Sequence, residues 1–266
     1  MTSNKSLIRY FLITFGISWL LWLPAVLRSQ GIADLPPIVG LIGNFALLGP
    51  FISAFLLTRR IDGRDGVRAL WRRGWSLKFD KRWLLPTLLF FPLQAAITVV
   101  LMLVLNMQID WSYSLALAAV PGNLLYIYFL NALPEEYGWR GFAIGRLQET
   151  YSALTASLLL GAIWACWHLP LFFITGTAQA AIPFYQFLLQ QMVFAVFYTW
   201  LFNNTNGSVL VAIIFHTMGN ITGALIPTWT SNGGRWTGFL VQLLIVAAVL
   251  AYWGPNHLHR HTAGTD

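Results

Sequence analysis

The sequence has very little charge. Asp, Glu, Lys and Arg make up 9% of its 266 residues, while hydrophobic residues make up 57%. Soluble domains carry roughly 25% charged residues, so this chain lacks the polar groups to cover a water-facing surface. Its apolar runs of about 20 residues are long enough to cross a bilayer, and they lack the alternation of membrane barrels. We therefore predict an all-α fold, a polytopic membrane helical bundle.

Cysteine is almost absent as well. Cys166, the single cysteine, lies inside an apolar run and is expected to be a small core residue. One thiol excludes an internal disulfide and a cysteine-based metal site within one chain. No repeat, linker or change of composition divides the chain, so residues 1–266 are predicted to form a single integral membrane domain.

The apolar segments predict about eight transmembrane helices, at about 7–27, 37–58, 83–106, 115–148, 154–175, 183–202, 207–226 and 236–253. If they alternate in direction, 14 of the 16 Lys and Arg residues fall on the side of the N-terminus, and the other two, Arg28 and Arg235, fall in loops on the opposite side. Such an excess marks the cytoplasmic face, which predicts an N-in, C-in orientation. The net charge of +7 is thus explained by topology, and no nucleic-acid partner is expected.

Ionisable side chains inside a bilayer cost roughly 2.5–3.5 kcal/mol each on insertion scales, so they need partners or a function. The polar candidates within the predicted spans are Glu135, Glu136, Arg140, His168, His216 and Asn220. Glu136 and Arg140 are four residues apart, so they share a helix face and are predicted to form an ion pair. Glu135 points about 100° away and is left without a partner on its own helix.

The depth of these residues depends on where the fourth span ends. Hydropathy alone ends it at Leu133, which would leave Glu135 at the membrane surface. If the helix continues to about residue 148, Glu135 and His168 each lie about 20 Å from the inner ends of their spans. His216 and Asn220 then lie about 14 and 20 Å along theirs. This convergence favours the long helix.

A carboxylate, two imidazoles and an amide at one depth suit hydrolysis. Glu135 can act as general base together with His168, while His216 and Asn220 can donate hydrogen bonds to an oxyanion. A zinc site formed by Glu135, His168 and His216 is the alternative, although no HExxH motif is present. Intramembrane Glu and His residues also mark proton-coupled transporters, and two histidines can ligate a haem.

Three ordered motifs carry a family resemblance. They are EEYGWR at 135–140, WACWH at 164–168 and HTMGN at 216–220. Together they resemble the EExxxR, FxxxH and HxxxN motifs of the CPBP family, the CAAX proteases and bacteriocin-processing enzymes of the Abi type. Trp164 stands where that family usually has phenylalanine, which puts the pocket shape in question. The family core would cover about residues 115–226.

The resemblance implies a function and a place in the cell. It implies an intramembrane endopeptidase of the CAAX prenyl protease type that cuts a peptide bond near the cytoplasmic side. Glu135 and His168 would activate water, His216 and Asn220 would form the oxyanion hole, and Glu136 and Arg140 would support them. The metal is left open, since the family mechanism has been described with a divalent metal such as zinc and with none.

The partners follow from the same resemblance. The substrate would be a peptide or protein delivered in the membrane, with or without a lipid anchor. The protein would lie in a bacterial or archaeal cell membrane, in contact with the bilayer. The alternative is a non-enzymatic protein of the same fold that serves in bacteriocin self-immunity or as a membrane interaction partner.

Overall fold

A computed structural model describes residues 3–259, and within them every regular element is a helix. The predicted all-α class is therefore confirmed. The main helices are α1 (Ser3–Ser29), α2 (Ile38–Gly43), α3 (Gly49–Arg73), α4 (Leu84–Val104), α5 (Val120–Tyr126), α6 (Leu133–Gly138), α7 (Ile144–Gln148), α8 (Ala153–Trp167), α9 (Phe184–Asn204), α10 (Val209–Leu225) and α11 (Asn232–Trp253).

Several of these helices are long and apolar enough to cross a membrane, which makes this an integral, multi-pass membrane protein. Six stretches of the described chain meet both conditions: Asn4–Ser29, Ile38–Arg73, Lys81–Val104, Trp111–Gln148, Ala153–Phe173 and Asn232–Trp253. The apolar α10 is shorter than these, and α9 contains three glutamines that lower its hydropathy. All eight predicted segments are helical, but a count of eight membrane crossings stays a prediction.

The fourth predicted span is continuously helical over residues 117–148. It does not end at Leu133. The long helix, which we predicted by comparing the depths of Glu135, His168, His216 and Asn220 in the membrane, is therefore confirmed. Two π-helical segments, η5 (Ile127–Ala132) and η6 (Trp139–Ala143), flank α6. Pro134, the second residue of α6, has no backbone N–H to donate, and such gaps in the hydrogen-bond ladder favour a locally wider turn. The widened turns lie on both sides of Glu135 and Glu136.

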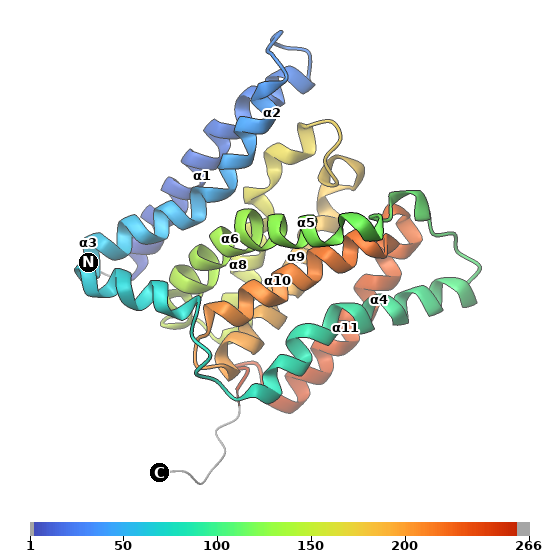
Figure 1. Cartoon of the computed structure of the whole chain (residues 1–266). Coiled ribbons are helices and arrows are strands. Elements are labelled where there is room, and N and C mark those ends of the chain that lie inside the picture. Colours follow the sequence, from blue (N-terminus) through green and yellow to red (C-terminus); the bar gives the residue numbers. More distant parts are fainter. Residues whose placement is uncertain (1–2, 260–266) are drawn as a thin grey trace.

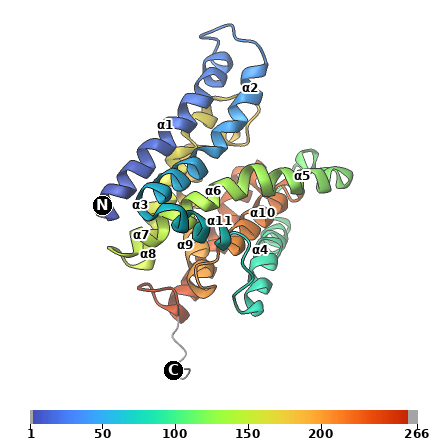
Figure 2. The ribbon, with the colours of Figure 1, turned by 60° about the vertical axis from the view of Figure 1, so that its left-hand side comes forward.

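The helices form an arm and a main body (Figures 1 and 2). The antiparallel α1 and α3 run side by side to form the arm, with α2 near its tip, and α3 also packs against α6. In the body, α4 packs against both α10 and α11, while α8 and α9 share the most extensive helix contact among the described elements. At their contact, a Cβ atom on Gly161 would lie 2.6 Å from the Cα of Met192. Small size at this position therefore sets the spacing of α8 and α9.

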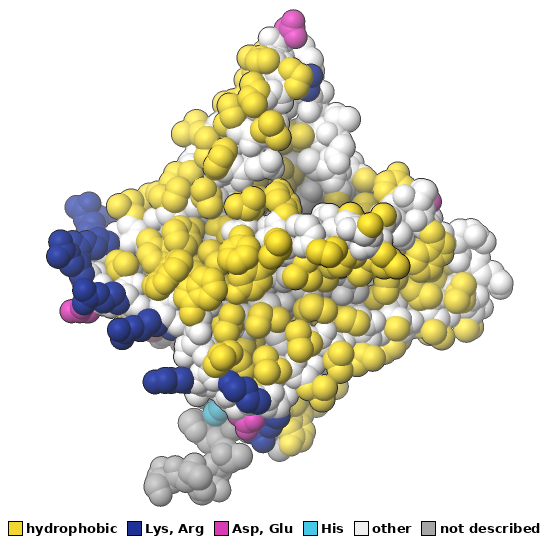
Figure 3. All heavy atoms as spheres, viewed as in Figure 1, with side chains coloured by type: hydrophobic (Ala, Val, Ile, Leu, Met, Phe, Trp, Pro, Cys, Tyr) yellow, Lys and Arg dark blue, Asp and Glu magenta, His cyan; other side chains and the backbone are white. Residues whose placement is uncertain are grey.

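Most of the basic side chains visible in Figure 3 lie on one side of the molecule, toward the start of α1, the end of α3 and the segment that follows it. The helix α3 bends at Gly63, where φ is +69°, a backbone conformation that glycine adopts readily. The segment after the bend carries much of the basic charge, and Arg260 lies outside the described residues. The uneven charge agrees with the N-in, C-in prediction, which no contact in the molecule tests.

Cys166 corrects one prediction from the sequence. It is exposed, not a core residue. The outer surface of a membrane protein faces lipid, so an apolar environment does not require a small apolar residue to be buried.

Candidate active site

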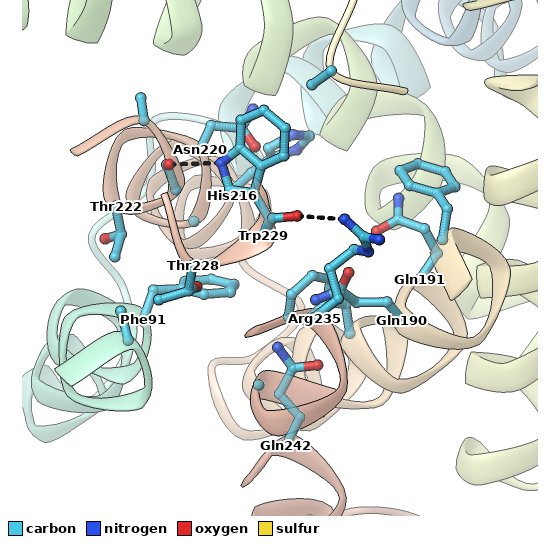
Figure 4. A pocket seen from close by; sticks show the side chains of 18 of the residues that line it. Phe91, Gln190, Gln191, His216, Asn220, Thr222, Thr228, Trp229, Arg235 and Gln242 are labelled. Atoms are coloured by element: carbon cyan, nitrogen blue, oxygen red, sulfur yellow. Dashed lines mark hydrogen bonds between the residues drawn. The ribbon is translucent and has the colours of Figure 1, made fainter. Parts of the chain in front are cut away.

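The predicted site residues meet at a cavity of about 420 Å³ inside the main body. It is lined by residues of α4, α6, α8, α9, α10 and α11, several of which are shown in Figure 4. Four of the predicted residues line it, namely Glu135, His168, His216 and Asn220. Glu136 and Arg140 are buried and do not line it. The structure therefore separates the six residues into a group at the cavity and a pair behind it.

Glu135 lies in the first turn of α6 and is 1% exposed. Two indole groups hold one of its carboxylate oxygens: Trp164 Nε1 donates to Oε2 at 2.7 Å, and Trp139 Nε1 donates to the same atom at 3.3 Å. Its other oxygen, Oε1, has no hydrogen-bond partner among residues 3–259. Because indole N–H groups only donate, they suit the ionised carboxylate and fix its position at the cavity wall.

Glu136 and Arg140 form the predicted ion pair. Arg140 Nη1 donates to both carboxylate oxygens of Glu136 at 3.0 Å, and both side chains are almost completely buried. The guanidinium lies 3.8 Å from the ring centre of Tyr198 and 4.8 Å from that of Trp164. These aromatic faces offset part of the cost of burying the cation. Trp164 thus contacts Arg140 with its ring face and Glu135 with its N–H.

His216 of α10 is hydrogen-bonded to Glu136 of the same buried pair. Its Nδ1 lies 2.8 Å from Glu136 Oε1, so this nitrogen carries a proton and donates to the carboxylate. The ring is 5% exposed and lines the cavity, which leaves Nε2 as its second polar atom. Glu136 therefore fixes both Arg140 and His216, a second task that the sequence did not predict.

His168 follows the last residue of α8 and is 7% exposed. Its Nδ1 lies 2.8 Å from the backbone carbonyl oxygen of Trp164. A carbonyl only accepts, so Nδ1 carries the proton and Nε2 of the neutral ring has a free lone pair. The rings of Trp167 and Phe187 pack edge-on against the imidazole and set its plane. In this tautomer His168 can accept a proton or a hydrogen bond through Nε2.

Asn220 lies one helical turn after His216 on α10 and is exposed to the cavity. Its Nδ2 donates to Asn131 Oδ1 at 2.8 Å. A side-chain amide has two N–H groups, so one remains for a further acceptor. His216 and Asn220 therefore share one face of α10, as their spacing predicts.

The three residues considered as zinc ligands, Glu135, His168 and His216, are not arranged as a metal site. In the described part of the chain no group of three His, Cys, Asp or Glu side chains comes close enough to hold an ion. The atoms that could bind an ion are Nε2 of each histidine and Oε1 of Glu135, since the Nδ1 atoms and the other Glu135 oxygen have protein partners, and these three side chains do not come together as such a group. The side chains as placed do not fit a tetrahedral zinc centre.

Sequence reasoning missed three polar groups of this site: the indoles of Trp139 and Trp164, and Arg235. Trp139 is four residues after Glu135, and Trp164 is four residues before His168, so helical spacing could have placed each indole beside an ionisable group. Arg235 lies in the first turn of α11 and lines the cavity. It was counted only as a loop charge on the outer side.

Known proteins match the part of the chain that builds this cavity. Residues 117–222 match the family described as type II CAAX prenyl endopeptidase Rce1-like. Over 256 residues the chain is 29% identical to the CAAX prenyl protease 2 of Methanococcus maripaludis, and the alignment covers 91% of this chain and 92% of that protein. The matched range includes all six predicted site residues.

Proposed function

We propose that this chain, a relative of the Rce1-like CAAX prenyl endopeptidases, is an intramembrane endopeptidase. These enzymes are the CPBP-type membrane proteases that its motifs resemble. The active site in this proposal is the cavity around Glu135. One observation carries the assignment of the site. Among the described residues that line the cavity, Glu135 is the single carboxylate, and it shares the cavity with two imidazoles whose Nδ1 protons are both fixed. This combination provides a general base and hydrogen-bond donors within one cavity.

The proposed reaction is hydrolysis of a peptide bond by an activated water. Glu135, helped by His168 Nε2, accepts a proton from the water as its oxygen bonds to the carbonyl carbon. The carbonyl oxygen becomes an oxyanion, which accepts hydrogen bonds from the free N–H of Asn220 and from His216 Nε2 in its doubly protonated form. The proton then passes to the leaving nitrogen as the C–N bond breaks.

Glu136 and Arg140 act behind the cavity in this proposal. Glu136 accepts a hydrogen bond from Nδ1 of His216, which orients the ring and leaves Nε2 directed to the cavity. Arg140 balances the charge of Glu136, so the buried group stays paired when His216 is neutral. Substitution of either residue is therefore expected to act on catalysis through the position of His216.

The substrate in this proposal is a peptide that reaches the cavity from the bilayer and is cut near the cytoplasmic side. The archaeal relative is named a CAAX prenyl protease, and a prenyl anchor on the substrate is one form of such delivery. The assay therefore uses membrane-delivered peptides in matched pairs, with and without a prenyl group. Cleavage of only the prenylated member of each pair is the expected result for a lipid-anchored substrate.

The decisive test compares wild-type protein with Glu135→Gln in liposomes that contain these peptides. Removal of the general base is expected to lower kcat by about 100-fold or more. Glu149→Gln is the matched control, because Glu149 is the single glutamate outside the buried site and is exposed. Full activity of the Glu135 variant would exclude the mechanism. Protection against a bacteriocin that survives loss of Glu135 and His216 would instead favour an interaction protein.

A further inference from the structure

Arg235 introduces an uncompensated positive charge into the cavity. It lies in the first turn of α11 and lines the same cavity as Glu135 and Asn220 (Figure 4). No carboxylate among residues 3–259 forms an ion pair with it. Cations are disfavoured near the N-terminus of a helix, so this position gains nothing from the helix dipole. A charge placed there without a protein partner suggests an anionic ligand.

Neutral groups hold the guanidinium in a fixed orientation. Arg235 Nε donates to Gln186 Oε1 at 2.6 Å, and Nη1 donates to the backbone oxygen of Trp229 at 2.9 Å. Gln186 is buried, and its Nε2 in turn donates to Asn232 Oδ1 at 2.6 Å. The second amino group of Arg235, Nη2, has no hydrogen-bond partner within the described residues. The result is a rigid arginine with one amino group left to donate.

The distance from the reacting groups can be followed along α10. Trp229, which holds Arg235, donates its indole N–H to the backbone oxygen of Gly223 at 3.0 Å. Gly223 is seven residues after His216, which corresponds to about 10 Å along the helix. Arg235 is connected to this part of α10 through Trp229, and it lines the same cavity as His216 and Asn220. A peptide bound in that cavity with its scissile bond beside His216 and Asn220 can therefore also contact Arg235.

We propose that Arg235 is a specificity-determining residue that binds the C-terminal carboxylate of the substrate peptide. The inference rests on the proposed endopeptidase function and adds the chemical group that this part of the cavity wall recognises. Arginine suits this task because its planar amino groups match the geometry of a carboxylate. Glu135, which lines the same cavity, would repel a carboxylate, so the two charges act in opposite senses on the end of a bound peptide.

The test uses a peptide that wild-type protein cleaves, prepared with a free C-terminal carboxylate and as the C-terminal amide. Wild-type protein is expected to show a KM about 10- to 100-fold lower for the acid than for the amide, as for a charge-assisted hydrogen bond in a partly enclosed site. Arg235→Gln is expected to raise the KM of the acid to that of the amide and to leave kcat nearly unchanged. Arg235→Lys keeps the positive charge but loses the two parallel amino groups, so its KM for the acid is expected to lie between those of wild-type protein and Arg235→Gln.

Two further experiments ask whether the carboxylate must be the C-terminal one and whether the arginine must lie in the cavity. An amidated peptide that ends in aspartate tests whether an acidic side chain can replace the terminus, and the amide is expected to stay the weaker substrate. Arg28→Gln is the matched control, because Arg28 is the other arginine predicted on the outer side and is exposed outside the cavity. It should keep the wild-type preference for the acid.

The inference would be overturned if wild-type protein treated acid and amide alike, or if Arg235→Gln slowed both in equal proportion. The second result would indicate a purely structural role. If no peptide is cleaved at all, the proposed function fails, and binding of the labelled acid and amide to Glu135→Gln decides the inference without turnover. Equal affinity for the two peptides would then exclude carboxylate recognition by Arg235.

Discussion

At the scale of single residues, Trp164 connects the two glutamates of the EEYGWR motif. Its indole N–H donates to Glu135, and its ring face lies over the Arg140 guanidinium that pairs with Glu136. The usual phenylalanine of the family motif offers a ring face but no donor. The departure from the motif thus adds a hydrogen bond to the predicted general base, and it can be tested by restoring the phenylalanine.

Trp164→Phe is expected to lower kcat about tenfold with little change in folding, because Glu135 loses its shorter hydrogen bond and keeps the longer one to Trp139. Peptide cleavage and a thermal unfolding curve measure the two effects. Trp200→Phe is the control, since the buried Trp200 Nε1 has no partner among the described residues and lies in the contact with Trp83 and Trp253. Equal loss of activity in both variants would contradict the role of the indole.

Arg140→Met is expected to lower the free energy of unfolding by about 3–5 kcal/mol, because Glu136 would remain buried without its cation. The double variant Glu136→Gln with Arg140→Met should recover part of this stability, but not activity, since His216 still lacks a carboxylate partner. Thermal unfolding together with peptide cleavage distinguishes these outcomes.

The control for this pair is Arg68→Met. Arg68 is paired with Asp65 at the surface, where the side chains are 71% and 93% exposed, so its loss should hardly change stability. If the double variant were less stable than Arg140→Met alone, the paired-charge explanation would be wrong.

Contacts between residues close together in the sequence could be predicted, whereas contacts between distant residues could not. The Glu136–Arg140 pair is four residues apart, so helix geometry alone placed it. The contact of His216 with Glu136 joins residues 80 positions apart, and it depends on how α6 and α10 pack. Comparison of depths in the membrane brought these helices to one level but could not choose which glutamate faces which histidine.

At the scale of helices, the length of the fourth span could be predicted from the sequence, but its internal geometry could not. Its continuation past Leu133 followed from the need to bring Glu135 to the depth of His168. The π-helical segments on either side of α6 were not predicted, because they depend on the lost N–H of Pro134 and on packing around it. Such segments change the rotation of the helix, so exact side-chain directions could not be derived from a regular 100° step.

The contact of α8 with α9 gives a prediction for helix packing. Gly161→Val is expected to lower the free energy of unfolding by about 1–3 kcal/mol or more, because the new side chain would meet the α9 backbone, which cannot move aside as a side chain can. Gly145→Ala in α7 is the control, since nothing lies within 4 Å of its added Cβ atom. Alanine there should be neutral or slightly stabilising through its higher helix propensity. Unfolding curves that coincide for the two variants would contradict the tight α8–α9 contact.

At the scale of the whole molecule, the distribution of charge is the feature that sequence predicts most directly. Most of the basic side chains visible in Figure 3 lie on one side of the molecule, and exposed large apolar side chains cover much of the remaining surface. Lipid contact makes this surface stable, whereas a water-soluble protein would aggregate through it. The direction of insertion follows from the basic side and not from the packing of the helices, which would be the same in either orientation.

Insertion with both termini inside predicts which loops face the cytoplasm. In a Cys166→Ser background, Gln108→Cys should react with a membrane-impermeant maleimide in intact cells, because the loop after α4 is predicted to lie outside. Thr150→Cys, in the turn after α7, should react only after the membrane is permeabilised. Both positions are exposed in the structure, so a difference in labelling reports sidedness rather than burial. Labelling of Thr150→Cys alone in intact cells would invert the predicted orientation and move the basic segment after Gly63 to the outer face, against the bias that normally sets topology.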